Sequence, residues 1–485
     1  MKSKTLLLTI LFLALCAIGH TQSAPTSVTA TLITTNSFQH AKIKEYHYPA
    51  TICCYVYDTV ENHYFSAFSY QNDTTMRSKI IFLSGYIVND FTIANDSVFF
   101  CGYDINQRGI IGFFSIHDLF YNDGNFYIQS NFIARDEDNY YYNVERFTKL
   151  VTLTNNNNER HIVCIGYTTA STVFRMACMV DFHTSSLPFP DATRPISPWS
   201  YESGLLIKRK PHYLLDIAIV GDYIITAGFN EYDKISLRKH NAQNVFALSG
   251  PQNQTLTFDI FAPSYTGPKE WNNDELLLTA YTSDTFAIAA TWIDNTGLKP
   301  RRAINISEYR INPLNGTFST STLVFKTLNI FGFPNEVSLK GFCGNRWTRK
   351  LALLFEGRST NDSIRSIFLE TTRLLTLPRA NLNKYTYYNE SLDAGLGGID
   401  LFNNHSQYVM AGRHEDPPSI HTFRVETSGV NSLCQPLVNC AFTTLPNISA
   451  SYSTNTFTIM GGIGNVQAIP RFNIKYWNIN IDCEE

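Results

Sequence analysis

Three aspartates stand at the same place in a repeated phrase, and they are the residues of this chain best suited to chemistry. The phrase is thirteen residues long, begins with the aspartate and ends with a glycine, at Asp90–Gly102, Asp216–Gly228 and Asp400–Gly412. Carboxylates gathered around one axis could bind a cation or act as a general acid and a general base. In the structural alternative, each carboxylate accepts backbone N–H bonds and joins its strand to a neighbouring repeat. Repetition favours the structural role, because a catalytic site is needed only once.

Aromatic and basic residues in expected loops form a second set of candidates, suited to ligand binding. Trp199 ends a proline-rich stretch, and Trp271 lies in a polar run read as a loop. Arg346 and Trp347 occupy a turn between two expected strands, and Tyr141 lies in a run of three tyrosines behind acidic residues. Exposed rings beside polar groups are typical of a face that binds a sugar or a protein. The alternative for each ring is that it folds back onto the core.

Other kinds of site find little support in the sequence. No phosphate-binding loop, dinucleotide fingerprint, zinc-protease motif or nucleophile elbow occurs in a usable context. We therefore expect no cofactor and no metal. The net charge of −3 and the charged fraction of 16% give no indication of a nucleic-acid partner.

The cysteines do not suggest a complete disulfide framework. Ten are present, and nine remain if Cys16 is removed with a leader, which is an odd number. Cys434 and Cys440 bracket a short loop and are the candidate disulfide. Cys101 and Cys164 lie in apolar strands, so we expect both to be buried free thiols.

Eight segments of the chain repeat one pattern: an apolar strand, a polar turn, and an apolar strand ending in a small residue. They are 54–68, 90–103, 148–167, 216–229, 278–292, 338–357, 400–413 and 449–462. One or two further strand-like runs usually follow, and helix signals are scarce. Four strands per repeat, arranged radially, is the composition of a β-propeller blade. The sequence predicts an all-β protein, a β-propeller of four-stranded blades, with eight blades favoured and seven as the alternative.

Two further expectations concern how the repeats fit together. The N-terminal run 27–35 is expected to pair with 471–481 and close the last blade, which would remove an exposed edge. The small residue that ends each second strand is expected to let neighbouring blades approach closely near the axis.

The first residues have the features of a secretory signal peptide. Lys2 and Lys4 precede a ten-residue apolar run, 6–15, which is too short to span a bilayer. We expect a signal peptide over 1–21, followed by a single β-propeller domain over 22–485 without a transmembrane segment. An exported protein of this kind would reside in the periplasm, at the cell surface or outside the cell.

In its repeated strand pairs, the chain resembles the secreted β-propeller proteins that Bacteroidales-type bacteria export. The resemblance covers nearly the whole mature chain and rests on repeat form. It implies an extracytoplasmic role at the cell envelope. Separately from the resemblance, the loop residues lead us to expect a protein or glycan ligand held on one face. We therefore expect a non-catalytic binding or scaffold module. The alternative is a propeller-fold carbohydrate-active enzyme, a glycoside hydrolase or lyase, which would need paired carboxylates about 5–10 Å apart. A structural subunit of a larger assembly is a third reading.

Overall fold

The structure is a computed structural model, built almost entirely of β-strands in the part of the chain that it describes. The described residues are 28–33, 38–46, 51–58, 63–69, 76–79, 81–82, 85–94, 97–115, 126–130, 132–135, 141–154, 160–171, 174–184, 201–206, 213–229, 235–242, 254–259, 269–280, 282–294, 301–314, 316–318, 324–330, 336–358, 364–372, 384–388, 399–402, 407–415, 418–426, 440–444, 449–454, 458–460, 465–469 and 474–481. The predicted signal peptide lies outside them.

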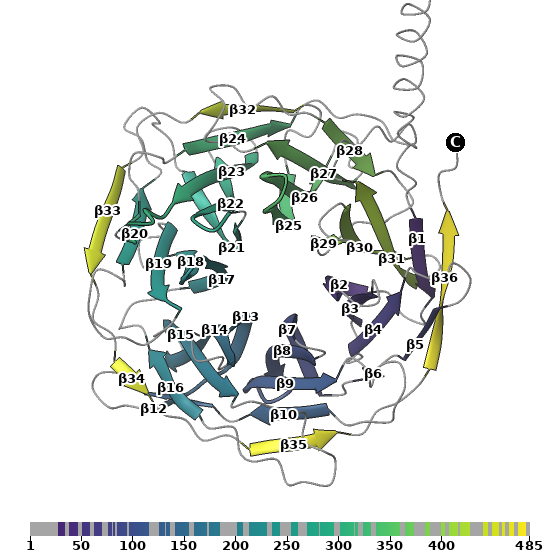
Figure 1. The fold of residues 1–485 in the computed structure, drawn as a ribbon, viewed down its shortest axis with the longest axis horizontal. Helices are drawn as coiled ribbons and strands as arrows, with labels where there is room; N and C mark the ends of the chain where they lie inside the picture. The colour runs from purple at the N-terminus through teal and green to yellow at the C-terminus, as the bar shows by residue number, and fades with distance from the viewer. Residues whose placement is uncertain are drawn as a thin grey trace, which may run out of the picture.

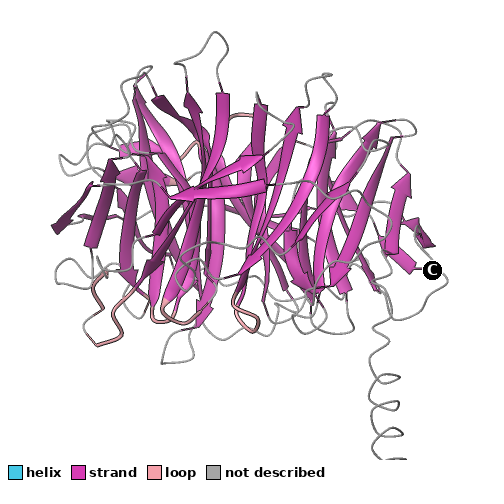
Figure 2. Ribbon diagram, turned by 90° about the horizontal axis from the view of Figure 1, so that it is seen from above, coloured by secondary structure: helices cyan, strands magenta, loops and turns pink. Residues whose placement is uncertain are grey.

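Antiparallel sheets stand radially around a central hollow, which is the arrangement of a β-propeller (Figure 1). Seen from the side, the strands run roughly along the short axis of a disc (Figure 2). Within the described residues, seven sheets have four or more strands, and one further sheet has two. We number the seven larger sheets 1 to 7 along the chain.

The first three sheets begin with consecutive strands and end, in sheets 2 and 3, with a strand from the C-terminal region. Sheet 1 holds β2 (Phe38–Tyr46), β3 (Thr51–Asp58), β4 (His63–Ser69) and β6 (Ile81–Phe82). Sheet 2 holds β7 (Tyr86–Ala94), β8 (Ser97–Asp104), β9 (Gly109–Ser115), β10 (Phe126–Ser130) and β35 (Asn465–Ile469). Sheet 3 holds β13 (Arg146–Thr154), β14 (Arg160–Ser171), β15 (Phe174–Thr184), β16 (Tyr201–Leu206) and β34 (Thr458–Met460). The small sheet pairs β11 (Ile133–Arg135) with β12 (Tyr141–Asn143).

The next three sheets follow the same order. Sheet 4 holds β17 (Tyr213–Val220), β18 (Tyr223–Phe229), β19 (Ile235–Asn241), β20 (Gln254–Asp259) and β33 (Ser449–Thr454). Sheet 5 holds β21 (Lys269–Ala280), β22 (Thr285–Asp294), β23 (Arg301–Arg310), β24 (Val324–Ile330) and β32 (Cys440–Thr444). Sheet 6 holds β25 (Glu336–Asn345), β26 (Lys350–Arg358), β27 (Ile364–Thr372) and β28 (Lys384–Tyr388).

Sheet 7 brings the two ends of the chain together. It holds β29 (Ile399–Phe402), β30 (Gln407–Glu415), β31 (Pro418–Glu426), β1 (Val28–Ile33), β36 (Ile474–Ile481) and β5 (Met76–Lys79). Strand β1 pairs antiparallel with β31 on one side and with β36 on the other. The pairing expected between 27–35 and 471–481 is therefore present, with Val28 opposite Ile481.

The C-terminal strands form a belt around the outside of the ring. Strands β32, β33, β34, β35 and β36 join sheets 5, 4, 3, 2 and 7 in turn, so most of the belt runs around the ring in the direction opposite to the chain before it (Figure 1). Strands β32 to β35 each pair with a strand that would otherwise be outermost, so a short strand of three to six residues forms the edge of each of these four sheets. A very short edge strand offers little backbone for pairing with other chains.

The belt corrects one expectation drawn from the repeats. Segment 449–462 was expected to be the eighth strand pair, but its two strands do not pair with each other. Strand β33 pairs with β20 in sheet 4, and β34 pairs with β16 in sheet 3. The first expected pair, segment 54–68, forms β3 and β4 and does not supply the inner strand of its sheet. That place is taken by β2. Local strand propensity therefore identified the strands but not their partners.

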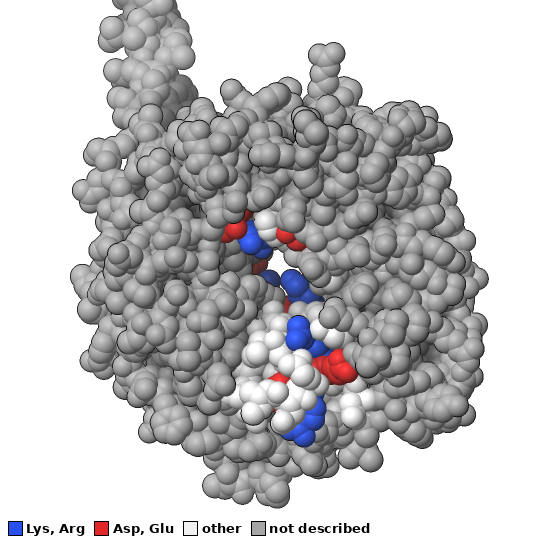
Figure 3. Space-filling model, turned by 180° about the vertical axis from the view of Figure 1, so that it is seen from behind, with Lys and Arg blue, Asp and Glu red and all other residues white. Residues whose placement is uncertain are grey.

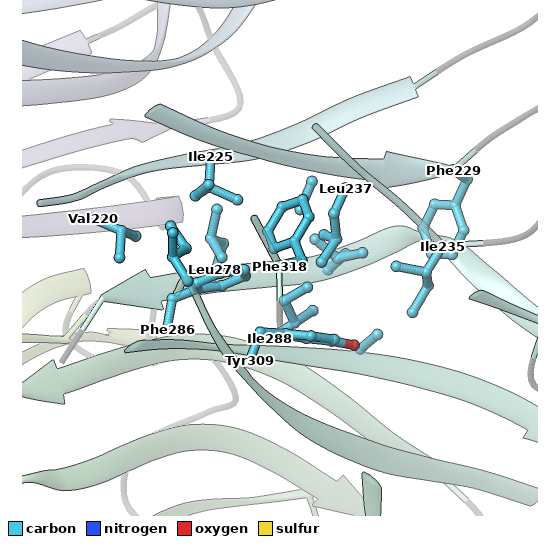
Figure 4. Close-up of a cluster of buried hydrophobic side chains, with 14 residues drawn as sticks. Val220, Ile225, Phe229, Ile235, Leu237, Leu278, Phe286, Ile288, Tyr309 and Phe318 are labelled. Carbon is cyan, nitrogen blue, oxygen red and sulfur yellow. The ribbon is translucent and has the colours of Figure 1, made fainter. Parts of the chain in front are cut away.

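The core lies between adjacent sheets. In sheet 4, Ile225 packs toward sheet 5 with Leu278 and Phe286 (Figure 4). Its neighbour Ile224 packs toward sheet 3 with Val163. Both faces of β18 are therefore buried, which explains its nearly continuous apolar sequence.

The glycine that closes the second strand is required by its own sheet. Bulges interrupt the inner strand before Asp90 and before Lys149, and Gly102 and Gly166 lie opposite these irregular points. A Cβ atom on Gly102 would collide with the carbonyl oxygen of Ile87 in the same sheet. The expected reason for a small residue here was the close approach of neighbouring blades. At Gly102 and Gly166 the reason is instead contact with the bulged partner strand of the same sheet.

Candidate functional site

The inner strands of the seven larger sheets enclose a cavity on the axis. These strands contact one another in the order β2, β7, β13, β17, β21, β25, β29 and back to β2. The cavity has a volume of about 240 Å³, and each of the seven strands contributes to its wall. Viewed from behind, the hollow is surrounded by acidic and basic side chains (Figure 3). The cavity is where residues from distant repeats meet.

The structure brings the three aspartates of the repeated phrase to this cavity. Asp90 Oδ2 accepts a hydrogen bond from the backbone N–H of Leu150, 3.2 Å away on the inner strand of the next sheet. Asp216 Oδ2 accepts one from Leu278 N–H, 2.8 Å away, again on the next inner strand. Two of the carboxylates thus connect adjacent sheets through the same kind of bond.

The third copy of the phrase differs in register. Asp216 lies opposite Ala227, the residue before the closing glycine, whereas Asp400 lies opposite Val409, three residues before Gly412. The equal spacing in sequence therefore does not correspond to equal pairing.

Glu275 makes a similar connection in sheet 5, where the phrase has no aspartate. Its Oε2 accepts the backbone N–H of Leu339 at 3.1 Å, and its Oε1 accepts the hydroxyl of Ser338 at 2.8 Å. Both partners lie on β25, the inner strand of sheet 6. The longer glutamate side chain starts from the irregular part of β21, between Trp271 and Leu276.

Lysines occupy the inner strands that lie between those with aspartates. Lys149 Nζ lies 3.6 Å from Asp216 Oδ1, and Lys44 Nζ lies 4.0 Å from Asp400 Oδ2. Around the ring, the charged residues that line the cavity alternate: a lysine on β2, Asp90 on β7, a lysine on β13 and an aspartate on β17. Beyond β21, a lysine on β25 and an aspartate on β29 follow in the same order. Strand β21 interrupts the alternation, because Leu277, Leu278 and Thr279 line the cavity there. We call the lysines and aspartates that line the cavity the charge ring: Lys44, Asp90, Lys149, Asp216, Lys340 and Asp400.

The third lysine of the charge ring is paired within its own sheet. Lys340 Nζ lies 3.3 Å from Glu356 Oε2, which belongs to the adjacent strand β26. Lys340 is also the residue at which the register between β25 and β26 shifts. A bulge at this position can re-aim a side chain, and Lys340 is among the residues that line the cavity.

Electrostatics keep the ammonium groups of Lys44 and Lys149 protonated. Burial alone would lower the pKa of Lys149, but the carboxylates of Asp216 and Asp90, with a hydrogen bond to Asp216, raise it above the ordinary value. The carboxylate of Asp400, assisted by that of Asp90, raises the pKa of Lys44 against the opposing effect of burial. Neither lysine is therefore a free base at neutral pH.

One end of the ring presents exposed side chains on ordered turns. The inner strands run side by side in the same direction. Asp216 of β17 bonds to Leu278 of β21, and residues in the turns that follow the two strands are also neighbours. A Cβ atom on Gly221, after β17, would lie 2.5 Å from the carbonyl oxygen of Ser283, after β21. Arg346, in the turn after β25, donates to the carbonyl oxygen of Ile219 at 3.4 Å. These turns therefore lie at one end, which we call the turn face.

Trp347 projects from the turn face. Its side chain is 76% exposed, unusual for a tryptophan. The turn beneath it is fixed, because the buried side chain of Asn345 accepts the backbone N–H of Trp347 at 2.9 Å and of Thr348 at 3.1 Å. The sequence-based placement of Arg346 and Trp347 in an inter-strand turn is consistent with this geometry.

The other candidates for ligand binding are placed differently. Trp271 was expected in a loop over 267–274, but it lies in strand β21, opposite Trp292 of β22. Tyr141 begins the short strand β12. Trp199 lies outside the described residues, as does Cys434 of the candidate disulfide, whose second member, Cys440, begins β32. Cys101 and Cys164 are buried free thiols, as expected.

The lysines of the charge ring and Glu275 escaped the sequence-based analysis. The prediction considered aspartate alone, whereas Lys149 occupies in β13 the place that Asp90 and Asp216 occupy in their strands, opposite the residue before the closing glycine. The turn between β13 and β14 is longer than the turns after Asp90 and Asp216, so a fixed spacing from the glycine does not lead to Lys149.

Two features are absent from the described residues. No group of three or more His, Cys, Asp or Glu side chains lies close enough together there to hold a metal ion. No helix in that part of the chain is long and apolar enough to cross a membrane.

Comparisons with known proteins assign no function to this chain. No protein-family model and no curated protein matches the sequence. Among solved structures, one from a study of two prolyl endopeptidases has a TM-score of 0.33 and 8% identity, covering 85% of this chain and 51% of that one. The chain thus spans about half the length of that structure.

Two further solved structures are glycoside hydrolases of family GH43. An engineered enzyme with endo-xylanase and exo-arabinofuranosidase activity has a TM-score of 0.24 and 6% identity, covering 89% of this chain and 100% of that one. A GH43_12 protein from a capybara gut metagenome has a TM-score of 0.19 and 6% identity, covering 87% and 100%. Similarity at this level assigns neither an activity nor a substrate to this chain.

Proposed function

We propose that the protein is a non-catalytic binding module whose ligand docks on the turn face, around Trp347 and Arg346. The observation that carries this proposal is the exposure of Trp347 on a turn that buried Asn345 holds in place. An exposed indole on a fixed turn offers a large contact area, and Arg346 beside it offers hydrogen-bond donors. Fixed aromatic and polar groups of this kind suit a glycan, which is the ligand class we favour over a protein.

The contacts of the carboxylates support a non-catalytic role. Glycoside hydrolysis needs one carboxyl group free to protonate the leaving group and a second free to act as base or nucleophile. Asp216 accepts a backbone N–H and faces Lys149, Asp90 accepts a backbone N–H, and Asp400 faces Lys44. These bonds give the carboxylates of the cavity a part in joining the sheets, in line with the structural reading.

We further propose that the propeller has seven blades. The seven larger sheets and the unbroken circle of contacts among their inner strands support seven over eight. In this arrangement, β1 and β36 complete the seventh blade next to β31, which ties both ends of the chain into the ring. A closed ring gives the turn face a rigid base, which suits a preformed binding surface.

The location and partners follow from the sequence. We propose that residues 1–21 direct export and that the remaining single domain acts at the cell envelope. Its partner there would be a glycan, or a protein carrying the same surface chemistry, and not a nucleic acid.

A glycan-array screen of the purified protein tests the proposal. The wild type is compared with Trp347→Ala and with Ile105→Ala, which removes another exposed apolar side chain. Ile105 is a matched control because its N–H bonds to Gly85 just before β7, at the end of the ring opposite the turn face. Glycan binding that Trp347→Ala abolishes and Ile105→Ala preserves would support the proposal. Binding unaffected by Trp347→Ala would refute the site, and capture of a protein instead of a glycan would change the ligand class.

A further inference from the structure

We propose that the axial cavity is a second binding site, which takes a small anion carrying at least two anionic oxygen groups, held by Lys44, Lys149 and Lys340. The three lysines come from β2, β13 and β25, and all line the same cavity. This site is separate from the turn face, so it stands or falls independently of the function proposed for Trp347.

The first reason is that the cavity presents its ammonium groups more than its carboxylates. In each pair the lysine side chain is the more exposed partner: 23% for Lys149 against 9% for Asp216, and 39% for Lys44 against 25% for Asp400. For Lys340 and Glu356 the values are 32% and 11%. Asp90, Asp216 and Asp400 also line the cavity, but because the lysines are the more exposed partners, a molecule in the cavity meets ammonium groups more than carboxylates.

The second reason is that the ammonium groups have donors to spare. Each carries three N–H donors, and an ion pair with one carboxylate uses only part of them. The carboxylates keep Lys44 and Lys149 protonated, as described above, so the donors are present at neutral pH. Charge-assisted bonds from several lysines to one anion are stronger than neutral hydrogen bonds.

The third reason is the shape of the cavity. Its volume of about 240 Å³ is below the range of roughly 300–1,000 Å³ typical of pockets for drug-sized ligands, so it suits a small molecule. On the sides of β21 and β25, Leu277 and Phe342 line the wall. An anion with a short carbon skeleton can place that skeleton against these side chains while its oxygen atoms face the lysines. This combination defines the ligand class as a small polycarboxylate or a small polyphosphate.

Calorimetric titration of the purified protein with citrate, pyrophosphate and acetate tests the proposal. Citrate and pyrophosphate distinguish a carboxylate from a phosphate ligand, and acetate has only one anionic group. We expect saturable 1:1 binding of citrate or pyrophosphate, at least about tenfold tighter than acetate, because two or more charge-assisted bonds replace one. The absence of saturable binding of either anion up to about 1 mM, the weak end of specific recognition, would overturn the proposal.

Paired variants separate binding from folding. Lys340→Gln removes a donor and should weaken binding about tenfold or more, whereas Glu356→Gln frees Lys340 and should tighten it several-fold. A purely structural ion pair would not give effects of opposite sign. Lys350→Gln is the matched control, because Lys350 begins β26 outside the cavity wall. Equal affinities of Lys340→Gln and Lys350→Gln would overturn the proposal, provided that thermal unfolding shows both variants to be folded.

Discussion

Lys149 Nζ lies 3.6 Å from Asp216 Oδ1, and the two residues occupy equivalent places after the bulges of adjacent inner strands, β13 and β17. The same position of the repeat therefore carries opposite charges in neighbouring sheets. A ring of aspartates alone would repel itself around the axis, whereas alternating signs allow charged side chains to attract their neighbours. This alternation turns a repeated sequence position into a connection between sheets.

The connection through Asp216 predicts a loss of stability when its carboxylate is removed. Asp216→Ala leaves Leu278 N–H without its acceptor and Lys149 without its nearest carboxylate. We expect the free energy of unfolding to fall by about 2–4 kcal/mol in urea titrations. Asp222→Ala, in the exposed turn after β17, is the control and should change stability by less than about 0.5 kcal/mol. Equal effects of the two substitutions would show that Asp216 does not join the sheets.

The bulge opposite Gly102 predicts that this position accepts no side chain. In Gly102→Ala, the added Cβ atom would collide with the carbonyl oxygen of Ile87, and the bulge would have to move. We expect a loss of about 2–3 kcal/mol, measured by urea unfolding. The comparison is Cys101→Ala, at the preceding buried residue, because this substitution removes atoms from the same strand without a backbone collision. A Gly102→Ala variant as stable as the wild type would contradict the bulge geometry.

Buried His240 predicts a specific pH dependence of stability. Burial, together with the charge of Arg238, lowers the pKa of His240 to about 3. Because the unfolded chain has an ordinary histidine pKa of about 6.5, it takes up a proton below that pH while the folded state does not. Stability contributed by neutral His240 is complete above about pH 6.5 and decreases as the pH falls toward 3.

The measurement compares wild type with His240→Gln in urea titrations at pH 7.5 and pH 5. The wild type should lose about 2 kcal/mol more than the variant over this interval, because one proton binds only to the unfolded state. If both proteins lose the same amount, His240 is not held neutral in the folded state.

The C-terminal belt predicts a change in association when it is removed. A chain ending at residue 439 lacks β32 to β36, which leaves β24, β20, β16 and β10 as outermost strands. Uncovered edges pair readily with other chains, so we expect the truncated protein to form oligomers and to unfold at lower temperature. Size-exclusion chromatography with light scattering and thermal unfolding provide the readouts. A monomer with unchanged unfolding temperature would show that the belt is dispensable.

The sequence was sufficient to predict the all-β character and most strand pairs, because β-branched and apolar runs around polar turns specify hairpins locally. The partners of β33 and β34 could not be obtained in this way. Their pairing with β20 and β16 joins segments about 200 and about 250 residues apart, respectively, and no local signal encodes such register.

The site could be anticipated only in part, for a related reason. The three aspartates were found because their spacing to glycine repeats, but Lys44 and Lys340 have no such phrase around them. Whether a charge faces the axis depends on which strand lies innermost and where it bulges, as at Lys340. Trp347 was identified because a polar turn between two apolar strands is a local feature.

A binding titration on the turn face tests the central claim most directly. The glycan that scores highest on the array is titrated into wild type, Trp347→Ala, Asn345→Ala and Ile105→Ala, with calorimetry as the readout. We expect Trp347→Ala to weaken binding by at least about tenfold, Asn345→Ala to weaken it less by loosening the turn, and Ile105→Ala to leave it unchanged. Equal affinity of wild type and Trp347→Ala would contradict the account, because the ligand would then bind somewhere other than the turn face.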